Sequence, residues 1–293
     1  PMSPPGRVHM PPPDNRAWLL LLPTVILLLV IGILPLLAVV NYGFHDIFTL
    51  SDVHWVGLEW FADILGSDRF LASLGRSLLF SVLVLSIQVP LGIGVALLLL
   101  HYRRRAVWGL MLCALPLVVP WNMIPILWLG MIDSRTGLLG PWLAAIGFDY
   151  KFTALHTWAL ILVMDTWHWL GLVVVLSYAA LSAIPPAFRQ AAAIDGASRW
   201  ALFRYIELPR MAGALSIVFL LRFVDSFMIY TEPFAINAGG PHDATRFLSI
   251  ELGEEIKGFS YGQAAARATL YLLIVLAVVW AFVVTVRGRE ARP

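Results

Sequence analysis

Residues 184–210 read IPPAFRQAAAIDGASRWALFRYIELPR, and this charged stretch decides the fold because it lies between two long apolar segments. Asp195-Gly196 is a turn signal, since glycine adopts positive φ without steric cost. Ala187–Ile194 before the turn and Ser198–Leu208 after it favour helix, so a helix–turn–helix hairpin is predicted. Residues 185–210 exceed the about 2–8 residues that usually join helices. The segment is therefore expected to do more than reverse the chain.

The segments on both sides are apolar enough to cross a membrane. Of the 293 residues, 60% are hydrophobic and only 13% are charged, whereas about a quarter are charged in a soluble domain. A membrane-spanning helix needs about 20 apolar residues. Six segments qualify, two of them with interior charges: Trp18–Val40, Ser77–Leu100, Ala106–Ile132, Phe152–Leu181, Met211–Thr231 and Ala268–Val286. The sequence predicts an all-α polytopic membrane protein with six transmembrane helices.

The loop charges predict an orientation. The amino tail, the second and fourth loops and the carboxyl tail carry twelve arginines and four acids, while the other loops carry six basic and twelve acidic residues. Basic residues are enriched in cytoplasmic loops, so both termini and the 185–210 loop are expected in the cytoplasm. The expected organisation is a Pro-rich tail at 1–16, a membrane domain at 17–288 and a short cytoplasmic tail at 289–293.

Several functional classes are disfavoured. Cys113 is the only cysteine and the net charge is +2, so neither an intrachain disulfide scaffold nor a nucleic-acid partner is expected. The sequence contains no metal-spaced His/Glu motif and no nucleophile elbow, so no catalytic residue and no metal ligand are predicted. A stand-alone secondary transporter or channel remains the alternative to an importer subunit, although no inverted repeat is visible.

One polar cluster falls within the fourth predicted span. Asp165 and His168 are three residues apart and share a helix face with Trp169, which is four from Asp165. A carboxylate, an imidazole and an indole suit the hydroxyls and apolar face of a polyol, and Trp167 is a further candidate for the solute pathway. The alternative is a membrane-interface position, where tryptophan is enriched.

Other intramembrane polar residues are weaker candidates. Arg222 and Asp225 are three apart and are expected to form an ion pair within one helix. Asp225 and Tyr230 are also candidates for lining a cavity, on adjacent faces. Asn122 lies between Pro120 and Pro125, where prolines free backbone carbonyls that are tolerated at a buried or cavity-lining position.

The stretch QAAAIDGASRWALFRYIELP, residues 190–209, resembles the cytoplasmic signature of ABC-importer permeases, most closely the sugar and polyol group related to maltose permeases. Matching positions are Ala191, Ala192, Asp195, Gly196, Ala197, Phe203, Ile206, Leu208 and Pro209. Gln190 replaces the glutamate of the family and removes its charge. The stretch LRFVDSFMIYTEPFAINAGGP, Leu221–Pro241, and the Trp167–Trp169 stretch resemble glycerol-importer permeases.

The resemblance implies a type I ABC importer permease fold and a transport role without enzymatic activity. The implied partners are a second similar permease, two cytoplasmic ATP-binding subunits, an external solute-binding protein and membrane lipid, in a bacterial inner membrane. The chain has no phosphate-binding loop, so ATP-Mg is expected on the partner. Residues implied in ATPase coupling are Gln190, Ala191, Ala192, Asp195, Gly196, Ala197, Phe203 and Pro209. A small neutral polyol or sugar is the expected solute, because Asp225 is expected to neutralise Arg222, the one base near mid-span. The resemblance to glycerol-importer permeases favours glycerol among these solutes.

Overall fold

The computed structural model describes residues 19–49, 52–102 and 105–290. The predicted tail at 1–16 and residues 291–293 lie outside this part. The long helices follow the predicted spans closely: α1 Leu22–Leu28 with a π segment Leu29–Ile33 and α2 Leu34–Tyr42, α4 Asp68–His101, α5 Ala106–Ala114, α6 Ile124–Ile132, α8 Ala154–Ser182, α11 Leu208–Phe227 and α14 Tyr261–Glu290. Five of these stretches are long and apolar enough to cross a membrane, or six when α5 and α6 count as one.

The third predicted span, Ala106–Ile132, is broken rather than continuous. A 3₁₀ turn at Leu115–Val118 follows α5, a second at Trp121–Met123 precedes α6, and the two halves meet at 81°. Pro116 and Pro120 fall at the break, and proline both removes a helical hydrogen bond and clashes with the preceding turn. The sequence predicted that prolines would free backbone carbonyls in this span. The structure shows in addition that the helix changes direction there.

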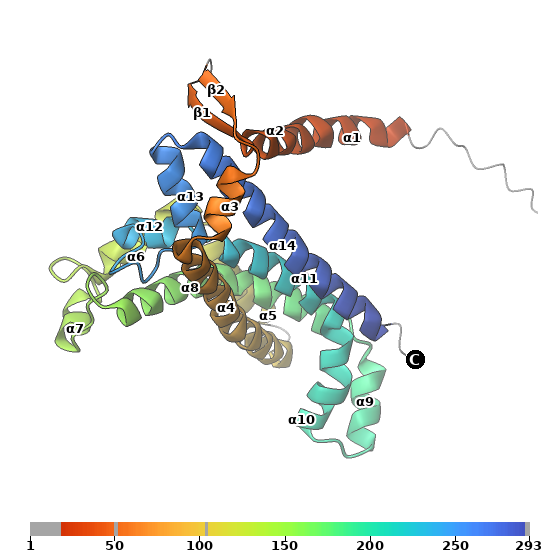
Figure 1. The fold of residues 1–293 in the computed structure, drawn as a ribbon. Coiled ribbons are helices and arrows are strands. Elements are labelled where there is room, and N and C mark those ends of the chain that lie inside the picture. The colour runs from red at the N-terminus through yellow and green to blue at the C-terminus, as the bar shows by residue number, and fades with distance from the viewer. Residues whose placement is uncertain (1–18, 50–51, 103–104, 291–293) are drawn as a thin grey trace, which may run out of the picture.

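The remaining elements are short. The β-hairpin pairs β1 His45–Thr49 with β2 Asp52–Trp55, with His45 opposite Trp55, and it is the exception to the all-α prediction within the described residues. Four further short helices are α3 Glu59–Leu65, α7 Gly140–Ala145, α12 Thr231–Asn237 and α13 Leu248–Lys257. Figure 1 places the β-hairpin at one end of the bundle and the pair α9 Pro186–Ile194 and α10 Arg199–Leu202 at the other.

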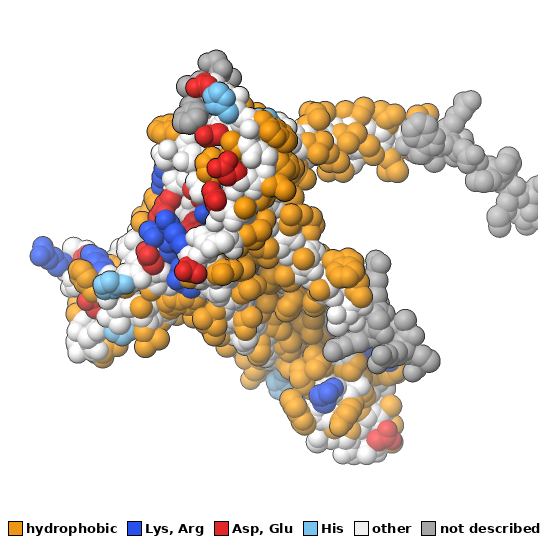
Figure 2. Space-filling view, in the orientation of Figure 1, with side chains coloured by type: hydrophobic (Ala, Val, Ile, Leu, Met, Phe, Trp, Pro, Cys, Tyr) orange, Lys and Arg blue, Asp and Glu red, His pale blue; other side chains and the backbone are white. Residues whose placement is uncertain are grey.

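The core of the bundle consists of α4, α8 and α11. Close approach between α4 and α8 depends on Gly92, where an added Cβ would lie 2.5 Å from the Val173 side chain. The first long helix, in contrast, has no buried residue and runs away from the bundle (Figure 1). Figure 2 shows hydrophobic side chains over the flank of the bundle and along this helix, as expected for surfaces that face lipid or another apolar partner.

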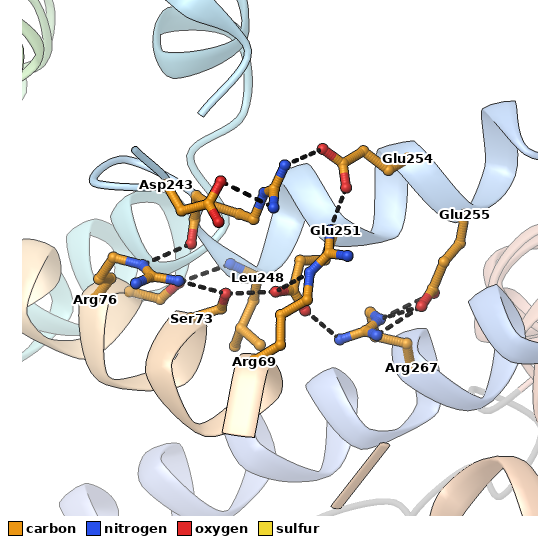
Figure 3. A network of polar contacts seen from close by, with 11 residues as sticks. Arg69, Ser73, Arg76, Asp243, Leu248, Glu251, Glu254, Glu255 and Arg267 are labelled. Carbon is orange, nitrogen blue, oxygen red and sulfur yellow. Dashed lines mark hydrogen bonds and ion pairs between the residues drawn. The ribbon is translucent and has the colours of Figure 1, made fainter. Parts of the chain in front are cut away.

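Charged side chains gather at the β-hairpin end, where an ion network joins α4, α13 and α14 (Figures 2 and 3). Glu251 is 1% exposed and accepts from Ser73 Oγ at 2.6 Å, from Arg69 Nε at 3.2 Å and from Arg267 Nη1 at 2.5 Å. Arg267 also holds Glu255 at 2.6 Å. Burial raises the pKa of the Glu255 carboxyl, against the opposing effect of Arg267. The network fixes the three helices at this end of the bundle.

Replacing Gly171 with alanine is predicted to destabilise the packing of α8 against the broken span. The new Cβ would lie 2.0 Å from the Cys113 carbonyl oxygen, and overpacking of this kind costs about 1–3 kcal/mol. We expect a lower thermal midpoint in detergent, measured by fluorescence-detected size exclusion. Gly213→Ala on α11 is the matched control, because a Cβ added there would have no heavy atom within 4 Å; an equal loss in both variants would contradict the packing argument.

Candidate functional site

Arg222 on α11 joins three helices inside the bundle. Its side chain is 1% exposed and its Nη2 lies 2.6 Å from Asp165 Oδ2 on α8. Its Nε donates to Gln88 Oε1 on α4 at 2.8 Å, and its Nη1 pairs with Asp225 on its own helix. Gln88 in turn donates from Nε2 to Asp165 Oδ2 at 2.7 Å. A buried charge is tolerated in a membrane only when it is paired, and these four residues, the Arg222 cluster, satisfy one another.

An aromatic ring completes the surroundings of the guanidinium. The Cζ atom of Arg222 lies 4.8 Å from the ring centroid of Trp169, within the range of a cation–π contact. Both Asp165 and Trp169 lie on α8, four residues apart, so the same face of that helix presents a carboxylate and an indole to Arg222. The ion pair of Arg222 with Asp225, predicted from their spacing, is present, and the link to Asp165 is an addition.

A cavity of about 720 Å³ lies beside the Arg222 cluster. Its lining combines carboxyl groups, aromatic rings and aliphatic side chains. The lining residues are Trp121, Ile124, Asp165, Trp169, Leu220, Leu221, Val224, Asp225, Met228, Ile229, Tyr230, Thr231, Glu232 and Val279. The helix α11 ends at Phe227 instead of continuing to Thr231, and α12 begins at Thr231. Because of that break, Tyr230 and Asp225 reach the same cavity, whereas a continuous helix would place them on adjacent faces.

Glu232 is a cavity residue that the sequence pattern did not single out. It is 7% exposed, and among the described residues its carboxylate pairs with no basic side chain. The cavity thus has three carboxylates, from Asp165, Asp225 and Glu232, against the single guanidinium of Arg222. No basic residue is among the described lining residues, and the neighbouring Arg222 already binds Asp165 and Asp225, so the cavity offers no free cation to an anionic solute. The sequence feature that could have identified Glu232 is a single acidic residue in an apolar stretch, one residue beyond the predicted span Met211–Thr231.

Three of the predicted pathway residues do not line this cavity. Trp167 packs edge-to-face on Trp128 with ring centroids 5.9 Å apart. His168 is buried and packs edge-to-face on Trp169 with ring centroids 4.9 Å apart, and Asn122 is exposed outside the lining. Of the three residues predicted to grip a solute, Asp165 and Trp169 line the cavity, where Asp165 also binds Arg222 and Gln88. His168 is not among the lining residues.

The second candidate site is the helical hairpin formed by α9 Pro186–Ile194, α10 Arg199–Leu202 and the π segment Phe203–Glu207. Gly196 has φ +71°, as the Asp195-Gly196 turn requires. The amide of Ala197 donates to the Ala192 carbonyl at 2.9 Å, which closes the turn. Ser198 caps α10 by accepting from the Ala201 amide at 3.2 Å. The predicted helix–turn–helix is thus present, and it projects from the bundle (Figure 1).

The tip of the hairpin presents most of the predicted coupling residues to the outside. Gln190, Ala191, Asp195, Gly196 and Ala197 are exposed, together with two apolar side chains, Ile194 at 87% and Trp200 at 69%. Two positions differ from the exposed group: Ala192 is buried and Phe203 is half-buried against Trp200. Pro209 is exposed as well but lies in the first turn of α11. Exposed apolar side chains at the tip of a projecting hairpin are typical of a surface that binds another protein.

The chain is similar in sequence to permease proteins of ABC transporters. A family model for the binding-protein-dependent transport system inner membrane component matches residues 88–289. A probable ABC transporter permease protein of Pyrococcus horikoshii is 30% identical, with 89% of this chain and 92% of that protein covered. The trehalose/maltose transport system permease protein MalF of Thermococcus litoralis is 27% identical, with 88% and 89% covered.

Solved structures share the fold. One chain of a bacterial ABC transporter involved in the import of the acidic polysaccharide alginate superposes with a TM-score of 0.79 at 21% identity, covering 94% of this chain and 96% of that chain. A bacterial alginate transporter in complex with a pentasaccharide-bound periplasmic protein gives 0.76 at 20% identity, covering 92% and 93%. These matches, together with the family model, confirm the predicted type I importer permease fold.

Removal of the Arg222 charge is predicted to destabilise the bundle through Asp165. Arg222→Gln leaves the buried Asp165 carboxylate without its cation, and loss of one partner of a buried pair costs about 3–5 kcal/mol. We expect a large drop in thermal midpoint and partial rescue by the double change Arg222→Gln with Asp165→Asn. Asp225→Asn is the control, because that side chain is 37% exposed; equal losses in the single and double Arg222 variants would argue against the pairing.

Proposed function

The chain belongs to the binding-protein-dependent transport system inner membrane components, and from that premise we propose that it carries a small neutral polyol or sugar, with glycerol as the favoured solute. It is a permease subunit of a sugar ABC importer, a multi-pass inner-membrane transport component rather than an enzyme. The observation that carries the mechanism is the exposed α9–α10 hairpin, because a stand-alone transporter needs no such projecting tip. An orientation with both termini and this hairpin in the cytoplasm completes the proposal.

The proposed energy source is a partner that hydrolyses ATP. Two copies of an ATP-binding subunit, each holding its own ATP-Mg, would grip one permease each through hairpins like α9–α10. The exposed Ile194 and Trp200 supply apolar contact area, and the small side chains of Ala191 and Ala197 allow close backbone approach. ATP-driven closure of the two subunits then rocks this chain against a second permease. A solute-binding protein on the other side delivers the solute.

The cavity beside the Arg222 cluster is the proposed solute pathway. Trp121, Trp169 and Tyr230 provide flat apolar walls, and the Asp225 and Glu232 carboxylates accept hydrogen bonds from hydroxyl groups. Its volume of about 720 Å³ lies within the range of small-ligand sites. The three carboxylates support an uncharged solute over a phosphorylated one, because a phosphate group favours clustered cations.

Gly196→Val is predicted to abolish ATP-driven uptake while leaving the chain inserted in the membrane. A side chain in the left-handed conformation costs about 1–2 kcal/mol, and valine is branched at Cβ. The measurement is co-purification of the ATP-binding subunit together with uptake in liposomes. Gly147→Val is the matched control, with φ +72° and no heavy atom within 4 Å, but outside the hairpin. Normal uptake by Gly196→Val would exclude the hairpin as the coupling element.

Glu232→Gln is predicted to lower glycerol uptake about two- to tenfold, because the loss of a hydrogen bond to a solute hydroxyl costs about 0.5–1.5 kcal/mol. Co-purification of the ATP-binding subunit should not change. Radiolabelled glycerol uptake in liposomes containing the complete importer measures the effect, with the exposed Glu59→Gln on α3 as control. Unchanged glycerol uptake by Glu232→Gln would remove Glu232 from the pathway.

A further inference from the structure

Glu207 is a buried carboxylate at the base of the helical hairpin, and nothing in the proposed function uses it. Its side chain has no exposed surface, although the surrounding hairpin projects from the bundle. Both of its oxygens are occupied: Oε1 accepts from Arg189 Nε at 2.9 Å, and Oε2 accepts from Arg199 Nη1 at 2.7 Å. Arg189 belongs to α9 and Arg199 to α10, so one carboxylate holds both arms of the hairpin.

The same contacts reach the long helices. Glu207 is the last residue of the π segment and immediately precedes α11, which begins at Leu208. The Nη2 atom of Arg189 donates to the Leu181 carbonyl at 2.9 Å. That carbonyl belongs to the last turn of α8, where helix carbonyls lack intrahelical partners and attract cations. Glu207, Arg189 and Arg199, here called the hairpin latch, therefore connect α9 and α10 to the ends of both α8 and α11.

Packing alone does not explain a carboxylate at this position. Replacing a buried ion pair by apolar residues is often neutral or stabilising, so such groups are retained for geometry more readily than for stability. The latch also has a counterpart deeper in the bundle. The helices α8 and α11 are joined a second time by Asp165 and Arg222, at 2.6 Å. Two ionic ties on one pair of helices resist sliding and rotation of either helix against the other.

We propose that Glu207 is a positioning residue for coupling: the hairpin latch makes α9 and α10 move as one body with α8 and α11. A displacement applied at the hairpin tip then reaches the Arg222 cluster and the adjoining cavity without being absorbed by bending at the hairpin base. The proposal rests on the proposed function, in which an ATP-binding subunit moves the hairpin. It also fits the neutral, exposed Gln190, since the carboxylate that orders this hairpin, Glu207, is buried at its base rather than placed on its docking face.

Glu207→Gln tests the latch, because the amide has the size of the carboxylate but lacks its charge. The complete importer in liposomes gives solute uptake per ATP hydrolysed, and hydrogen exchange with mass spectrometry gives the protection of residues 186–207. We expect the ATP-binding subunit to co-purify, exchange in the hairpin to accelerate, and uptake per ATP to fall about fivefold or more, the lower range of coupling between sites. Arg204→Gln is the control, since this exposed arginine lies in the same π segment and contacts the Tyr205 ring, not Glu207.

Additional variants separate positioning from folding. Arg189→Gln combined with Glu207→Gln should lower uptake per ATP no further than Glu207→Gln alone, since residues of one network are not additive. Arg199→Gln removes only the contact of Glu207 with α10, so it should lower uptake per ATP by an intermediate amount. This variant serves as the test if the Glu207→Gln protein is not produced in the membrane. Unchanged exchange and unchanged uptake per ATP in these variants would overturn the latch. If the unaltered chain captures no ATP-binding subunit, the proposed function fails, and hydrogen exchange alone still tests the latch.

Discussion

The guanidinium of Arg222 is the constraint on which the interior of this protein depends. A fully buried cation inside an apolar bundle is tolerated only if its donors are occupied, and Asp165, Asp225 and Gln88 occupy them. Since these partners lie on α8, α11 and α4, satisfying one side chain sets the relative positions of three helices. The same requirement brings Asp165 and Asp225 to Arg222, and both carboxyl groups also line the adjoining cavity.

The arrangement joins the two candidate sites through the same pair of helices. At one end, α8 and α11 carry Asp165 and Arg222 beside the cavity; at the other, they enter the helical hairpin, where Glu207 binds Arg189 and Arg199. A packed core transmits displacement because it has few voids to absorb it. Coupling between an ATP-driven partner and the solute pathway therefore needs no flexible linkage, only that these helices move together.

Breaks in regular structure produce the features that line the cavity. The third span bends at its prolines, and α11 stops at Phe227 before α12 begins at Thr231. In a membrane, backbone groups freed by such breaks must find partners inside the protein, and the Pro116 carbonyl accepts from the Val119 amide at 3.1 Å. The breaks place Trp121, Tyr230 and Glu232 at one cavity. A bundle of uninterrupted helices would bury these side chains or leave them facing lipid.

The sequence by itself determined the class of protein, the long helices and the hairpin turn. Apolar length fixes a membrane span, and Asp195-Gly196 specifies a reversal, because both are local properties of the chain. Partners at 57 to 134 residues' separation, such as Asp165 and Gln88 for Arg222, were decided only by the tertiary structure. Helical spacing places Asp165 and His168 on one face, yet Asp165 binds Arg222 and lines the cavity, whereas His168 is not among the lining residues. A buried charge selects its partner by proximity in space, which periodicity along one helix does not contain.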